Sequence, residues 1–136
     1  MSRIQTERER LLTVLMQAYS LSELLDIMRS VCQNMSHSSM NTKSRHFGHF
    51  KLTLFGLTVK ADGLTERMEL NLDLLRKAMP ECEDSYRRLK KIREGISLAH
   101  GLIKRNKIDE GKERIIGVAD EYSAVFEQVM RLKKNL

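Results

Sequence analysis

Residues 11–35, LLTVLMQAYSLSELLDIMRSVCQNM, are the stretch that decides the fold. Apolar residues recur there at alternating spacings of three and four, at Leu11, Val14, Ala18, Leu21, Leu25, Met28, Cys32 and Met35. This spacing puts every member on one side of an α-helix, and three repeats of it are typical of a seam between helices. We therefore expect one long helix over about residues 5–34.

The apolar surface of this helix is wider than a single seam, because it also includes Leu12, Leu15, Met16, Leu24, Ile27 and Val31. A core-facing helix usually has one apolar stripe and a polar back. The extra width predicts that the helix lies centrally in a bundle or pairs with a second copy. Ser20 and Glu23 match a capping box that could start a second helix. The seam passes through Ser20 without changing phase, so a single helix is favoured.

A second seam ends the chain, at Ile115, Val118, Tyr122, Val125, Val129, Leu132 and Leu136. We expect Asn106 to end the preceding helix in a left-handed conformation and Asp109 to cap this one. A seam that reaches the chain end suggests a homodimer. The residues expected to form the core and the self-association surface come from both seams: Leu11, Leu25, Met28, Tyr122, Val125, Val129 and Leu132.

The middle of the chain is less clear. Residues 36–46 are polar and rich in Ser, which predicts a loop with freedom to move. Residues 50–60 fit either helical spacing or a short β-hairpin turning at Gly56, and we favour the helix because an isolated two-stranded ribbon is marginally stable. Two further helices are expected over about 64–79, ended by Pro80, and 81–105.

These elements predict an all-α fold in one domain over residues 1–136. The expected architecture is a bundle of four or five helices with long N- and C-terminal ones, and a hairpin at 50–60 as the alternative. The chain has no Trp, eight Met and one Pro, so Leu, Ile, Val and Met must fill the core. Gly95 and Gly101 weaken the helix expected over about 81–105 or allow another helix to come close to it.

The sequence also favours an intracellular protein, cytoplasmic or nuclear and not secreted. The charged run of residues 1–10 does not resemble a signal peptide, and no window approaches the roughly 18 apolar residues of a membrane span. Cys32 and Cys82 fall at expected core positions, which predicts two reduced, buried thiols.

The whole chain has a net charge of +6, and two basic regions, residues 37–60 and 87–107, flank an acidic segment. Residues 61–86 hold three basic and seven acidic residues, while residues 87–107 hold eight basic ones and a single acid. The eight, candidates for contact with an anionic partner, are Arg87, Arg88, Lys90, Lys91, Arg93, Lys104, Arg105 and Lys107. Such an array attracts polyanions, so the phosphate backbone of RNA or DNA is one expected partner. A peripheral contact with an anionic membrane surface stays open. The alternative is a solvated face that pairs with the acids of residues 66–84 on a neighbouring helix.

Signs of catalysis are weak. His46 and His49 are only a weak possibility for a metal site, because their spacing matches no standard finger and no second Cys is near. Phosphate-binding loops and nucleophile motifs are missing from the sequence. We therefore expect a protein that has no enzymatic activity and binds neither a metal nor a cofactor.

The leading prediction is a non-enzymatic helical protein–protein interaction module that self-associates, with a dimer favoured. It would serve as an adaptor, chaperone, regulator, or viral accessory or structural protein. The alternative is a regulatory or matrix-type protein that binds the RNA or DNA backbone through a basic helix at 87–107.

Overall fold

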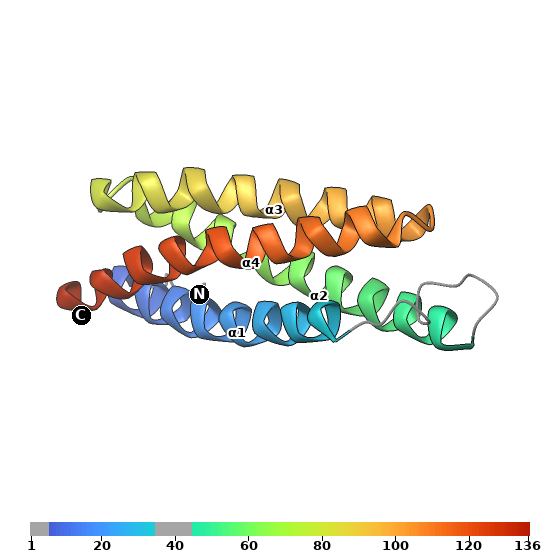
Figure 1. The fold of residues 1–136 in the computed structure, drawn as a ribbon. Coiled ribbons are helices and arrows are strands. Elements are labelled where there is room, and N and C mark those ends of the chain that lie inside the picture. The colour runs from blue at the N-terminus through green and yellow to red at the C-terminus, as the bar shows by residue number, and fades with distance from the viewer. Residues whose placement is uncertain (1–5, 35–44) are drawn as a thin grey trace, which may run out of the picture.

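The computed structural model describes residues 6–34 and 45–136, which form a four-helix bundle. Its helices are α1 (Glu7–Gln33), α2 (Arg45–Leu75), α3 (Glu83–Lys104) and α4 (Ile108–Met130), with short 3₁₀ segments η2 (Pro80–Cys82) and η3 (Arg131–Asn135). Consecutive helices run antiparallel, and the start of α1 and the C-terminus lie at the same end (Figure 1). Each helix packs on the next, and α4 returns to α1. The described residues contain no strand, so the prediction of an all-α bundle is confirmed.

The helix α1 is continuous through Ser20, as its uninterrupted seam predicts. Its N-terminus is capped by Thr6, whose hydroxyl oxygen accepts a hydrogen bond of 3.1 Å from the Glu9 N–H. This satisfies one of the free N–H groups of the first turn. The seam faces the interior, where α1 buries Leu11, Val14, Leu15, Ala18, Leu21, Leu25, Met28 and Cys32. Met35, the last expected member, lies outside the described residues.

Residues 50–60 are helical and belong to α2, so the hairpin alternative is wrong. Buried side chains recur along α2 at helical spacing, including Phe47, Leu54, Ala61 and Met68. Alternation in a strand would bring Leu52 to the same face as Leu54, whereas Leu52 is among the most exposed apolar side chains. The long helix also absorbs residues 45–46 from the expected loop, whose residues 36–44 lie outside the described part. It ends at Leu75, earlier than expected, and Pro80 opens η2.

The turn between α3 and α4 is built around Asn106, whose φ of 63° is left-handed, as predicted. The Lys107 N–H donates to the Leu102 carbonyl at 2.8 Å and the Asn106 N–H to the Ile103 carbonyl at 3.0 Å. These bonds satisfy carbonyls at the end of α3. The N-cap of α4 is Lys107 and not Asp109, which lies in the first helical turn, so that capping prediction is wrong.

One buried hydrogen bond ties α4 to α1 in the core. The Tyr122 hydroxyl donates to the Ala18 carbonyl at 2.7 Å, and burial raises the pKa of Tyr122. This partner lets the polar end of Tyr122 lie inside the bundle without an unsatisfied group. A second polar link joins α2 to α3, where Thr58 Oγ1 lies 2.8 Å from His100 Nδ1 and the ring of Phe55 rests against that imidazole.

By length and composition alone, α1 is apolar enough to cross a membrane, which the sequence expectation did not allow for. The reason is that its apolar residues lie on more than one side. Only 39% of the most apolar window is buried in the bundle. A core helix passes the same test, and α1 does place its seam in the core; its outer face nevertheless leaves large apolar side chains in contact with solvent.

Truncating the seam should destabilise the bundle far more than truncating the outer face of the same helix. Leu25→Ala is expected to lower the free energy of unfolding by about 2–5 kcal/mol, because Leu25 is 2% exposed and its loss leaves a cavity. Ile27→Ala, at a side chain 53% exposed, should cost under about 1 kcal/mol. Urea denaturation measures both, and equal losses would contradict the assignment of α1's inner face.

Candidate interaction surfaces

The seven seam residues expected to mediate self-association all lie inside the monomer. Each is at most 3% exposed: Leu11, Leu25, Met28, Tyr122, Val125, Val129 and Leu132. Their prediction as core residues is confirmed. Their expected second role as a partner surface does not fit this packing, because the helices of one chain already cover them. Any surface for a partner has to lie on the outside of the bundle.

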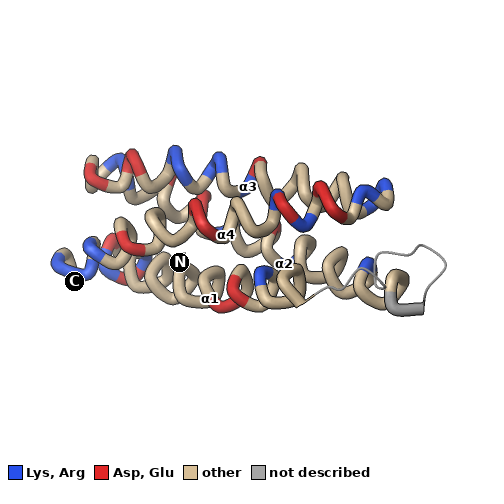
Figure 2. The backbone as a smooth tube through the Cα atoms, viewed as in Figure 1, with Lys and Arg blue, Asp and Glu red and all other residues tan. Residues whose placement is uncertain are grey.

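The first turns of the basic helix are partly neutralised by acids of their own helix. Arg87 Nε lies 3.0 Å from Glu83 Oε1, and Arg88 Nε lies 3.2 Å from Asp84 Oδ2. Arg76 of the α2–α3 connection also binds Glu83, at 2.9 Å, and its hydrogen bond lowers the pKa of that carboxyl. The first turn of α3 is therefore acidic, and the basic residues follow it from the second turn on (Figure 2).

Arg93 is directed toward α2 and not toward a partner. Its guanidinium lies 3.4 Å from Glu69, 3.5 Å from Asp62 and 3.7 Å from Glu66. Partial burial works to lower the pKa of Arg93, but the hydrogen bond to Glu69 and the two other carboxylates raise it overall. Arg93 therefore pairs with acids of a neighbouring helix, as the alternative interpretation of the basic block predicts.

The remaining basic residues are exposed and, in the part of the chain that the structure describes, have no ion-pair partner: Lys90, Lys91, Lys104, Arg105 and Lys107. Lys90 lies over the Tyr86 ring, 5.3 Å from its centroid. The last three form the basic tip at the α3–α4 turn, the blue end of that hairpin in Figure 2. The 87–107 block is thus divided into a mostly paired start and an unpaired tip.

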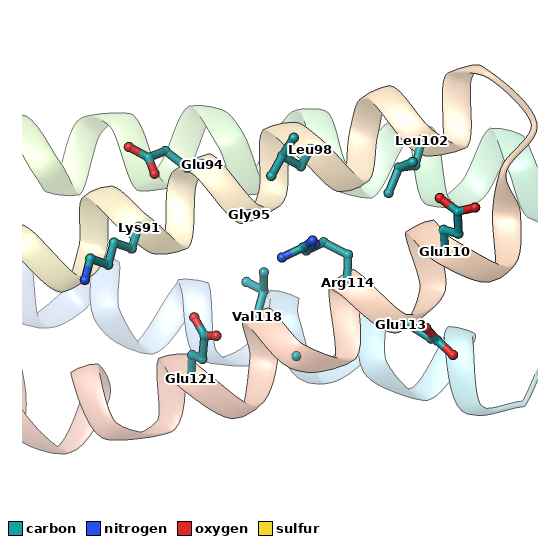
Figure 3. Close-up of a pocket in the computed structure, with 11 residues that line it drawn as sticks. Lys91, Glu94, Gly95, Leu98, Leu102, Glu110, Glu113, Arg114, Val118 and Glu121 are labelled. Atoms are coloured by element: carbon teal, nitrogen blue, oxygen red, sulfur yellow. The ribbon is translucent and has the colours of Figure 1, made fainter.

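A groove of about 470 Å³ runs between α3 and α4, and the sequence did not predict it. Gly95, Gly117 and Val118 are among its lining residues. Leu98 and Leu102 point from α3 into the space between the helices, and Arg114 reaches into it from α4 (Figure 3). Leu98 is 54% exposed although its side chain is fully apolar. We call this feature the α3–α4 groove.

Two glycines of the groove act in different ways. A Cβ at Gly95 would come within 2.6 Å of Val118 Cγ2, so Gly95 lets the helices approach closely, as the sequence suggested. A Cβ at Gly117 would meet nothing within 4 Å, and the same is true of Gly101. Glycine inside a helix costs about 1 kcal/mol relative to Ala. Packing within the monomer therefore gives no reason for Gly117, a lining residue of the groove at which an added side chain would enter open space.

The rim of the α3–α4 groove is predominantly acidic. Glu94, Glu110, Glu113 and Glu121 line it together with two cations, Lys91 and Arg114. Across residues 6–34 and 45–136, none of these four glutamates takes part in an ion pair. Acids elsewhere on α2 and α3 are mostly bound by arginines. The groove therefore combines apolar lining residues with carboxylates that form no ion pair among the described residues.

The thiols and imidazoles offer little chemistry. Cys32 and Cys82 are buried and free, and burial raises the pKa of each thiol to about 11. His49 is exposed, and nothing is described of the His46 side chain. Among the described residues no three His, Cys, Asp or Glu side chains gather as metal ligands.

Comparisons of this chain with family models, curated proteins and solved structures give no match.

Adding one methyl group at each groove glycine should give opposite effects on stability. Gly95→Ala should lower the free energy of unfolding by about 1 kcal/mol or more, because Val118 is β-branched and cannot easily turn away. Gly117→Ala should raise it by up to about 1 kcal/mol, since the new methyl group meets open space. Thermal unfolding of both variants measures this, and a stabilised Gly95→Ala would refute the close approach of α3 and α4.

Proposed function

We propose that this chain is a non-enzymatic protein–protein interaction module of the adaptor kind, which holds a helix of another protein in the α3–α4 groove. The observation that carries the proposal is the groove itself, with its exposed Leu98, its open floor at Gly117 and its acidic rim. Amphipathic helices commonly dock in apolar grooves of this kind.

The rim indicates the chemistry of the partner. Four glutamates against two cations leave the groove net negative, so a complementary helix carries Lys or Arg beside its apolar stripe. The stretch of α3 from Lys91 to Leu102 lies along the groove, which corresponds to about 17 Å or three helical turns of a partner. Arg114 can turn toward Glu110, four residues earlier on the same helix, and leave the floor free.

The polar groups of the groove support binding and not catalysis. They are exposed carboxylates and cations at its rim, and the floor is apolar. A catalytic site needs a nucleophile or base held against its partners, and the groove's described lining residues show no such hydrogen-bonded arrangement. An adaptor needs only shape and charge.

The groove is tested with a synthetic helical peptide of about three turns made of Leu and Lys, and a matched peptide in which Glu replaces Lys. We expect the Leu–Lys peptide to bind and the Leu–Glu peptide not to. Gly117→Leu should weaken binding at least about tenfold, because its side chain fills the floor, while Gly117→Ala has a smaller effect. Fluorescence anisotropy of a labelled peptide gives the dissociation constants.

Glu127→Lys is the matched control, because Glu127 is an exposed acid of α4 that does not line the groove. It should leave peptide binding nearly unchanged. If Gly117→Leu bound the peptide as tightly as the unmodified protein does, the groove would not be the docking site.

The second candidate function is binding to the backbone of RNA or DNA, and the specific observation that favours it is the basic tip. Lys104, Arg105 and Lys107 are exposed and unpaired among the described residues. Three adjacent cations release counterions when they contact phosphates. Arg93 no longer supports this function, because α2 carboxylates surround it.

The triple variant Lys104→Glu, Arg105→Glu, Lys107→Glu tests the basic tip. We expect it to lose binding to duplex RNA and DNA of arbitrary sequence at low salt. The slope of log affinity against log salt should fall by about 3, one unit for each lost phosphate contact. The double variant Arg87→Glu, Arg88→Glu is the comparison and should have a smaller effect, because both arginines already pair with acids. An unmodified protein that binds no nucleic acid at low salt would remove this candidate.

A further inference from the structure

The outer face of α1 carries a ridge of large apolar side chains near its N-terminus. Leu12, Met16 and Tyr19 follow each other at spacings of four and three, which places them on one side of the helix. They are 50%, 63% and 46% exposed. Tyr19 is held in place, because its ring lies edge-on to Phe126 at 5.3 Å and its hydroxyl accepts a hydrogen bond of 3.0 Å from Lys133 Nζ. We call these three residues the α1 ridge.

A hollow of about 450 Å³ lies near the other end of the same helix. Its apolar lining is Ile27 and Val31 of α1 and Phe50 of α2, and its edge includes Asp26. Ile27 is 53% exposed, so the hollow opens to the outside of the bundle. We call it the α1 hollow.

The ridge and the hollow are matched in position along α1. Leu12 and Val31 lie equally far from the middle of α1, and so do Met16 and Ile27, because both pairs are centred between Leu21 and Ser22. When two copies of α1 lie antiparallel around a two-fold axis near the middle of the helix, the ridge of each copy meets the hollow of the other. Two-fold symmetry makes both contacts at once.

Charge supports the same arrangement. Lys133 stands beside the ridge, and Asp26 stands at the edge of the hollow. Within the described residues neither side chain forms an ion pair. Antiparallel association brings the Lys133 ammonium of each copy toward the Asp26 carboxylate of the other. A parallel arrangement would leave both charges without a partner and place ridge against ridge.

We propose that a second copy of this chain docks on the outer face of α1, antiparallel, with the ridge of each protomer seated in the hollow of its partner. This contact is separate from the α3–α4 groove and does not depend on it. One helix pair is a small interface, so the dimer is expected to form in the micromolar range. The wide apolar surface of α1 then has two uses: its seam fills the bundle, and its back holds the partner.

Analytical ultracentrifugation from low to high micromolar concentration tests the proposal. The unmodified protein should dimerise. Met16→Glu should raise the dissociation constant about a hundredfold, because each dimer contains the buried charge twice. Leu52→Glu is the matched control, an equally drastic change at a side chain 74% exposed on α2, and should leave the dimer intact. Circular dichroism and urea denaturation establish that each variant stays folded.

A charge exchange tests the antiparallel register independently of folding. Lys133→Glu and Asp26→Lys should each weaken the dimer by about tenfold, and the double variant Lys133→Glu, Asp26→Lys should recover most of the loss. Recovery requires that the two positions meet across the interface.

Three outcomes would overturn the proposal. These are a monomer at high micromolar concentration, a Met16→Glu variant that dimerises like the unmodified protein, and a double exchange no better than its single variants. None of them bears on peptide binding in the α3–α4 groove, so the two proposals fail separately. A monomer whose outer α1 face is captured by a different protein would count against the second copy as the occupant.

Discussion

The structure depends on the burial of the α1 seam against α2 and α4. Each fully buried Leu, Ile or Met contributes about 1.5–3 kcal/mol relative to an exposed one, and α1 alone buries eight residues. The second seam, on α4, packs on α1, and the Tyr122–Ala18 hydrogen bond joins the two helices. The two longest apolar seams of the sequence are therefore buried within one chain. Everything that remains available to a partner is consequently on the outside of the bundle.

Ion pairing decides which outer charges remain available. The acids of α2 surround Arg93, and the acids at the start of α3 bind Arg76, Arg87 and Arg88. These ion pairs neutralise many of the charges in the acidic segment 61–86 and the basic segment 87–107. The charge left over is arranged differently: negative along the α3–α4 groove and positive at the turn beside it. The pattern of unpaired surface charge therefore follows the packing of the helices and not the order of the sequence.

The groove and the outer face of α1 lie on different sides of the bundle, since α1 and α3 are each flanked by α2 and α4. A partner helix in the groove and a second copy on α1 therefore do not compete for space. The proposed dimer would present two copies of the same groove, and two linked sites bind a multivalent partner more tightly than either does alone.

By itself, the sequence determined the helices, their inward faces and the left-handed Asn106, because spacing and turn chemistry are local properties. It also indicated that α1 is apolar beyond one seam. The apolar run of residues 50–60 is too short for its spacing to distinguish a helix from a hairpin. In the structure it is helical, because that conformation buries Leu54 and the adjacent Ala61 in the bundle. Tertiary packing alone decided that the seams close on each other, that Arg93 is neutralised by α2, and that Gly117 opens a groove. Each of these depends on which helices become neighbours, and neighbours far apart in the chain are not encoded in the period of any one segment.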